Sequence, residues 1–145
     1  MIVRAATKTD ANAVTGLALR LFPDHLYDEL RKEMSSYIDG AESVIFLAED
    51  AGEAVGFAQC GLRHDYVEGT CSSPVGYLEG IYVLEGYRRA GTASNLVAAS
   101  EAWAKAHGCH QFASDCELSN TLSIAFHLGA GFAEAGRLVC FTKEL

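Results

Sequence analysis

The chain has 145 residues with a net charge of −8, and 50% of its residues are apolar. This length is typical of a single domain that buries an adequate core, so we expect one domain over residues 1–145. The negative charge argues against a nucleic-acid partner, which requires a basic face, and suits a cationic ligand, although it can also serve solubility alone.

The sequence shows no feature that predicts a membrane span or a metal site. No apolar run is long enough to cross a bilayer, and the start MIVRAATKTDAN lacks the apolar core and cleavage site of a signal peptide. The five cysteines form no CxxC pair and no Cys/His set with metal-ligand spacing. We therefore expect a cytoplasmic protein with reduced thiols and with neither membrane nor metal partners.

The first half of the chain predicts a strand, two helices and a β-hairpin. Residues 2–5 form a short apolar run, and Thr9 or Asp10 can cap a helix that Pro23 ends. A second helix is expected over residues 25–38, where apolar residues recur at helical spacing. The apolar runs SVIFLAED and AVGFAQCGLRH follow, joined by DAGE, which predicts a hairpin with glycine in its turn.

The second half predicts alternating strands and helices. We expect a strand over 75–84, a helix over 90–107, a short strand in HQFASD and a helix over 120–129. From Phe132 onward, ending in LVCFTKEL, we expect a closing strand or strand pair. The order β-α-α-β-β-β-α-β-α-β predicts an α/β fold with a mixed sheet, in which an antiparallel meander precedes a parallel pair joined by a helix.

The segment VLEGYRRAGTAS, residues 83–94, connects an apolar strand to the helix that follows it. The helix start offers unpaired amides beside small side chains, and Gly91 can adopt conformations closed to other residues. Arg88 and Arg89 add forked donors that match phosphate oxygens. The pattern predicts a diphosphate cradle. No Gly-Lys-Ser/Thr follows, as nucleotide hydrolases require, and the dinucleotide fingerprint needs a different glycine spacing, whereas coenzyme A has a diphosphate that is held and not hydrolysed. The alternative is a helix start whose arginines pair with acids such as Glu85.

The stretch Arg88-Arg89-Ala90-Gly91-Thr92-Ala93 resembles the acyl-CoA pyrophosphate motif of the GNAT acetyltransferase superfamily, and the element order is similar to that fold throughout. More narrowly, the chain resembles the aminoglycoside 6′-N-acetyltransferases over nearly its whole length. The segments that carry this resemblance are LFPDH (21–25), RHDYVEGTCSSPVGYLEGIYVLEGYRRAG (63–91), FASD (112–115) and HLGAGF (127–132).

The resemblance implies an enzyme that transfers acetyl from acetyl-CoA to the 6′-amine of aminoglycoside antibiotics by direct attack in a ternary complex, which confers resistance. It also suggests a homodimer. The backbone amide of Val83 would polarise the thioester carbonyl. Asn120 is assigned to the co-substrate, although it can also serve as a helix-start residue. The complete set assigned to acetyl-CoA is Ile81, Tyr82, Val83, Arg88, Arg89, Ala90, Gly91, Thr92, Ala93 and Asn120.

Three residues are candidates for the proton transfers. Glu79 is an acid among apolar strand residues, where it can anchor or deprotonate a cationic amine or, alternatively, form an ion pair. Asp115 follows a short strand; the resemblance assigns it to the substrate's amine, and it can also cap a helix. His127 stands where many superfamily members have the tyrosine that protonates the leaving thiolate, and it can do that work or simply pack. Glu79 and Asp115 are equal candidates for the base.

The resemblance implies that the strand of Glu79 carries a bulge and splays from its neighbour, which Gly80 would ease. Relatives commonly have tryptophan at position 22 and an acid at position 136, so this chain's residues there bear on which drugs are accepted, amikacin or gentamicin for example. Two rivals stay open: a GNAT enzyme for another small amine (polyamine, amino sugar or peptide N-terminus), and a non-catalytic domain that binds acyl-CoA or drug. Besides the two carboxylates, the residues assigned to the aminoglycoside are Phe22, His25, Tyr66 and Gly136.

Overall fold

The structure, a computed structural model, describes residues 1–145 without gaps. In chain order its elements are β1 (Ile2–Ala5), the 3₁₀ turn η1 (Lys8–Asp10), α1 (Ala11–Leu21), α2 (Tyr27–Asp39), β2 (Ser43–Asp50), β3 (Glu53–Arg63), β4 (Val75–Val83), the 3₁₀ turn η2 (Glu85–Tyr87), α3 (Thr92–Ala106), β5 (Phe112–Ser114) and α4 (Thr121–Gly129). Every helix and strand expected from the sequence is present except the closing strand. No helix is both long enough and apolar enough to cross a membrane.

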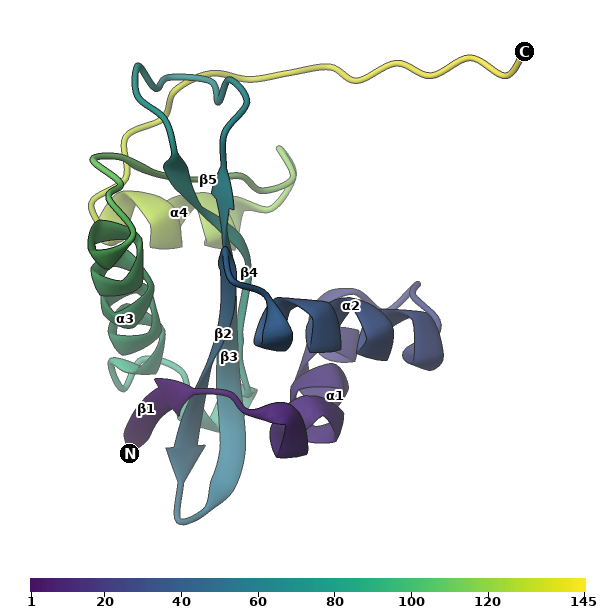
Figure 1. Cartoon of the computed structure of the whole chain (residues 1–145), viewed down its shortest axis with the longest axis vertical. Coiled ribbons are helices and arrows are strands. Elements are labelled where there is room, and N and C mark those ends of the chain that lie inside the picture. Colours follow the sequence, from purple (N-terminus) through teal and green to yellow (C-terminus); the bar gives the residue numbers. More distant parts are fainter.

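The strands form one five-stranded sheet in the order β1-β2-β3-β4-β5 (Figure 1). The first four pair antiparallel with their neighbours, and β5 pairs parallel with β4 through the crossover helix α3. The β2–β3 hairpin turns at Ala51 and Gly52, whose φ angles of 50° and 82° match the turn that such hairpins favour. The predicted meander and parallel pair are therefore confirmed.

The core lies in two layers, one on each face of the sheet. Figure 1 shows α1 and α2 on one face and α3 on the other. The buried residues of the first layer are Val14, Leu17, Ala18, Leu30, Met34, Ile45, Leu47 and Phe57. Those of the second layer are Ala48, Val55, Ala58, Cys60, Leu78, Val83, Leu96 and Val97. Burial of these side chains, at about 25 cal/mol per Å² of apolar surface, is the main force that fixes the helices on the sheet.

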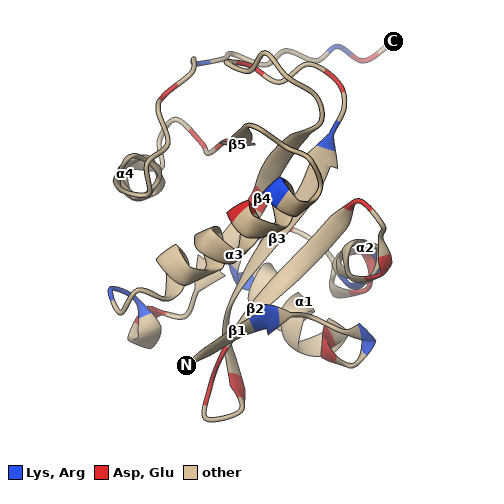
Figure 2. Cartoon of the chain, turned by 60° about the vertical axis from the view of Figure 1, so that its left-hand side comes forward, with Lys and Arg blue, Asp and Glu red and all other residues tan.

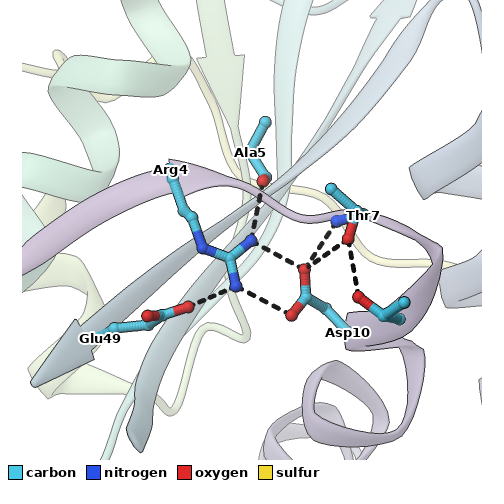
Figure 3. A network of polar contacts seen from close by, with 6 residues as sticks. Arg4, Ala5, Thr7, Asp10 and Glu49 are labelled. Carbon is cyan, nitrogen blue, oxygen red and sulfur yellow. Dashed lines mark hydrogen bonds and ion pairs between the residues drawn. The ribbon is translucent and has the colours of Figure 1, made fainter. Parts of the chain in front are cut away.

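A network around Arg4 joins β1 to the start of α1 (Figure 3). The Arg4 guanidinium donates to both carboxylate oxygens of Asp10, at 2.8 and 2.9 Å, and also contacts Glu49 on β2. Asp10 further accepts the Thr7 backbone N–H at 2.7 Å. Asp10 precedes α1 as expected, but its side chain makes no cap hydrogen bond to that helix. The hydrogen bonds from Arg4 hold the pKa of the Asp10 carboxyl well below its usual range.

The closing strand expected from Phe132 onward is wrong for the single chain. Residues 132–145 form no helix or strand, and the C-terminal segment runs away from the sheet (Figure 1). A strand is stable only when its backbone groups pair with a neighbour, and within this chain none lies beside the segment. Phe141 is consequently 87% exposed, and Leu138 and Val139 are exposed as well.

Candidate active site

Strands β4 and β5 separate next to a β-bulge. On β4, the pairing with β3 shifts between Gln59 and Cys60, so that Glu79 has no partner. The parallel pairing with β5 ends at Leu78 and Ser114, where β5 itself ends. The bulge and the splay implied by the resemblance are therefore present. Together they open a slot at the carboxyl ends of the parallel strands, where ligands of α/β sheets bind.

Gly80 contributes to the slot by close packing, because a side chain there would meet the end of α1. A Cβ atom on Gly80 would lie 3.1 Å from Leu21 Cδ2 and 3.3 Å from Phe22 Cζ. Its φ angle does not lie in the left-handed region. Glycine at this position therefore lets the end of α1 pack closely against the bulged strand. We had expected it to relieve strain in the backbone of the bulge.

Two backbone amides of β4 face the slot. The Leu84 N–H donates to Val55 O at 2.8 Å, so the alternation of an antiparallel pair turns the N–H and C=O groups of Ile81 and Val83 away from β3. Since β5 no longer pairs there, these groups point into the slot. Arg88 closes one end of it, with its Nε donating to Val83 O at 2.8 Å. An amide such as that of Val83 can stabilise a developing oxyanion.

The loop before α3 has the unpaired amides that the predicted cradle needs. The backbone N–H groups from Arg89 to Ser94 donate no hydrogen bond within the chain, and Gly91 adopts the left-handed region with φ 83°. Arg89 also has a positive φ, of 60°, and is exposed. The left-handed Gly91 explains why α3 begins at Thr92 instead of Ala90. These unpaired amides at a helix N-terminus suit an anionic group.

The arginines of this loop do not form the ion pairs offered as the alternative. Neither Arg88 nor Arg89 has a carboxylate partner, although Glu85 is close in sequence. The Arg88 guanidinium carbon lies 5.3 Å from the centre of the Tyr82 ring. Both cations are thus free of acidic partners beside the unpaired amides, as a phosphate site requires.

Glu79 forms the ion pair that was considered as its alternative role, but it is not sealed in the core. The Arg63 Nη2 donates to its carboxylate oxygens at 2.8 and 3.0 Å, and the Arg63 Nε donates at 3.2 Å. The Glu79 side chain is 22% exposed, so solvent and ligands reach it. The Arg63 Cζ atom lies 3.4 Å from the centre of the Tyr77 ring, which adds a cation–π contact.

Asp115 lies directly after β5 and accepts a hydrogen bond from the Tyr77 hydroxyl. Burial and then this bond to Asp115 raise the pKa of Tyr77 above its usual value, so the phenol stays a donor. The capping alternative for Asp115 is wrong, because Asn120 caps α4 by accepting the Ser123 N–H at 3.1 Å. The helix-start role of Asn120 is therefore confirmed.

His127 is held between α4 and the end of β5. Its Nδ1 lies 2.7 Å from Ser123 O, which makes this nitrogen a donor. Its Nε2 lies 2.8 Å from Ser114 Oγ, and Ser114 Oγ donates to Leu78 O at 3.1 Å. Through the serine hydroxyl, the imidazole is thus connected to Leu78 and Ser114, the last paired residues of β4 and β5.

The residues assigned to the aminoglycoside lie on two connections. Phe22 and His25, between α1 and α2, contact each other with tilted rings whose centres lie 5.5 Å apart. Phe22 also borders Gly80, as described above. Tyr66, in the β3–β4 connection, is 76% exposed. A Cβ atom on Gly136 would lie 3.6 Å from the Glu68 carboxylate, so an acidic side chain lies beside this position.

Sequence reasoning missed Arg63, Tyr77 and Ser114. The spacing of Tyr77 and Glu79, two residues apart on one strand, places both on one face and could have indicated the tyrosine. Ser114 immediately precedes Asp115 at a strand end, which is a weaker signal. No local sequence signal indicated Arg63, because its partner Glu79 lies 16 residues away in the sequence and across a bulge.

Comparisons with known proteins agree with this geometry. Residues 12–132 match the model of the acetyltransferase (GNAT) family. An aminoglycoside N(6′)-acetyltransferase type 1 from Acinetobacter genomosp. 13 is 46% identical over 90% of this chain and 89% of its own. Aminoglycoside N-acetyltransferase AAC(6′)-Iy in complex with CoA superposes with a TM-score of 0.95 at 37% identity, over 99% of this chain and 95% of its own. The same enzyme with the bisubstrate analogue CoA-S-monomethyl-acetylneamine gives a TM-score of 0.94 at 37% identity, over 99% and 98%.

Proposed function

The chain belongs to the acetyltransferase (GNAT) family and to its aminoglycoside 6′-N-acetyltransferases, and from this premise we propose that it acetylates the 6′-amine of aminoglycosides by direct attack in a ternary complex. Acetyl-CoA supplies the acetyl group as an activated thioester. The observation that carries the proposal is the slot between β4 and β5, where backbone groups of β4 are unpaired and where the carboxylates of Glu79 and Asp115 adjoin the last paired residues. Acetylation removes a positive charge from the drug and adds bulk, so the drug binds ribosomal RNA less well.

The chain offers suitable groups along the whole length of the co-substrate. The unpaired amides from Arg89 to Ser94 and the two arginine side chains would hold the diphosphate. The slot-facing groups of Ile81 and Val83 would bind the pantetheine arm by strand-like hydrogen bonds. The Val83 N–H would stabilise the oxyanion of the attacked carbonyl. Tyr82 would serve mainly by packing beside Arg88.

Glu79 and Asp115 would bind the ammonium groups of the drug and accept the proton that the 6′-amine must lose before it can attack. The position of both at the slot supports this role, since each carboxylate is held by a single neighbouring residue and keeps further lone pairs for a ligand. Phe22, His25 and Tyr66 would line the rest of the pocket. Glu68 would supply the charge that Gly136 lacks, because its carboxylate occupies the space beside that position.

His127 would protonate the leaving thiolate through Ser114 and not directly. Because Nδ1 already donates to Ser123 O, this step uses the imidazolium form of His127. Its Nε2 proton would pass to Ser114 Oγ while the serine hydroxyl turns away from Leu78 O and gives its own proton to the sulfur, which leaves a neutral imidazole and a thiol. The 2.8 Å contact between these atoms supports the transfer, as does the position of Ser114 at the last paired residue of the slot. Ser123 O fixes the opposite nitrogen and hence the ring orientation.

We further propose that the protein is a cytoplasmic, single-domain homodimer. The five strands form one sheet, which supports one domain over residues 1–145. Helix α4 contains no Lys, Arg, Asp or Glu (Figure 2), and none of its residues is buried. Its Leu122 is 80% exposed. The C-terminal segment 132–145 exposes further apolar side chains next to it in the chain. A second copy would cover both, and would give the C-terminal segment the strand partner that it lacks.

The reaction is tested by thiol release from acetyl-CoA with kanamycin and tobramycin, and by NMR of the product to locate the acetyl group on the 6′-nitrogen. Rapid turnover of a polyamine or peptide amine with no turnover of either drug would contradict the substrate assignment. Drug binding without any thiol release would instead indicate a binding domain. Light scattering tests the dimer: the wild type should have the mass of two chains, and Phe141→Asp the mass of one.

A further inference from the structure

Arg63, the last residue of β3, joins the two acids of the site into one network. Its guanidinium binds Glu79 through Nη2 at 2.8 Å and through Nε at 3.2 Å. The guanidinium carbon also lies 3.4 Å from the centre of the Tyr77 ring, and the Tyr77 hydroxyl donates to Asp115. The free site therefore already contains a cation, in contact with the carboxylate that would receive the substrate's ammonium.

This ion pair is not needed to neutralise a buried charge. The Arg63 side chain is 42% exposed and that of Glu79 is 22% exposed, so water reaches both groups. Ion pairs of this exposure contribute little to the free energy of unfolding. Arg63 is also the terminal residue of its strand, where it pairs only with Val75 at the start of β4. A purely structural role therefore leaves the position of Arg63 over the acids without an explanation.

On the basis of the proposed function, we infer that Arg63 is an internal counterion that the aminoglycoside displaces from Glu79. An ammonium that approaches Glu79 meets the like charge of the guanidinium, so binding exchanges one cation for another. The contact with the Tyr77 ring gives the guanidinium a second favourable partner in the same place, so that it can release Glu79 without leaving the site. Arg63 then lowers the affinity for cationic substrates, and the network holds the acids in place when the site is free.

Titration calorimetry of the CoA-bound protein with neamine tests the sign of this effect. Arg63→Gln should lower the Kd for neamine by about tenfold and make it more sensitive to salt, because one repulsive charge is lost. Arg63→Lys keeps the charge without the planar fork, and its Kd should stay near that of the wild type. Lys105→Gln, on α3 at the opposite face of the sheet, loses the same charge and should leave the Kd unchanged.

A structural role gives different results from those of a counterion. If Arg63 mainly orients Glu79, Arg63→Gln should weaken neamine binding, and Arg63→Lys should do so too; either that result or an unchanged Kd would overturn the inference. CoA binding and the melting temperature are measured for each variant, so that misfolding is not mistaken for lost affinity. Wild-type turnover of neamine separates the two proposals: if it is present, a failed sign test removes only the counterion role, and if it is absent, both proposals fail.

Discussion

Two arginine networks in this protein use the same chemistry to different ends. Arg4 binds Asp10 and Glu49 at the junction where β1, β2 and the start of α1 meet, and Asp10 also accepts the Thr7 amide (Figure 3). Arg63 binds Glu79 on a bulge, beside a strand that has lost its neighbour. The first network ties elements together, whereas the second lies where β4 has lost its strand neighbour and its backbone groups are unpaired. The surrounding backbone, more than the ion pair itself, separates a structural site from a functional one.

The largest expected effect is the loss of activity on removal of a site carboxylate. Glu79→Gln and Asp115→Asn should each lower kcat/KM for kanamycin by about a thousandfold, within the range that proton transfer and charge binding contribute. Their melting temperatures should stay near that of the wild type, because the pairs are partly exposed. Steady-state kinetics and thermal denaturation check both points. The variant with the greater loss in kcat identifies the base, and full activity in both would contradict the assignment.

The relay from α4 should have a smaller effect. Ser114→Ala and His127→Gln should each lower kcat by about ten- to a hundredfold, because the leaving thiolate loses its proton donor. If the two residues act in series, the double variant should be no slower than the worse single variant. A double-mutant cycle on kcat measures this. Multiplied losses would show that the residues act independently, and an unchanged KM for acetyl-CoA is the control for binding.

The Arg4 network should show the reverse pattern, with lost stability and intact catalysis. Asp10→Asn should lower the free energy of unfolding at neutral pH by about 1 kcal/mol and leave kcat unchanged. The pKa of Asp10 is depressed in the folded protein, so its contribution is present above the unfolded value of about 3.9 and is lost as the pH falls through the folded value. Urea unfolding at several pH values should show the two proteins converging in acid. A drop in kcat without a change in stability would contradict the comparison.

The smallest expected effect concerns the neighbour of Gly136. Glu68→Gln should raise KM for kanamycin by about threefold and leave kcat unchanged, since one long-range attraction to a polycation is lost at an exposed position. Glu68→Gln combined with Gly136→Asp should recover the KM if the two positions supply one charge between them. Steady-state kinetics at low salt is the most sensitive measurement. A loss in kcat instead would place Glu68 in the reaction itself.

The sequence predicted most of the fold correctly because its signals are local. Helical spacing, the DAGE turn and Pro23 after α1 each depend on residues within a few positions, and the corresponding elements are present. The differences at helix starts have equally local causes, such as the left-handed Gly91 before α3. The predicted C-terminal strand failed for a different reason, since its pattern calls for a strand but a strand requires a partner that this chain does not provide.

By itself, the sequence determined the order of elements, the helix-start loop before α3, the acid within β4 and the acid after β5, because apolar periodicity and helix-start chemistry are written in neighbouring residues. Only the tertiary structure decided that Glu79 is paired with Arg63, that Tyr77 holds Asp115 and that His127 reaches the slot through Ser114. These pairs are separated by 16, 38 and 13 residues. Their contacts depend on the register of a bulged hairpin and on the crossing of helices over the sheet, which no short stretch of sequence specifies.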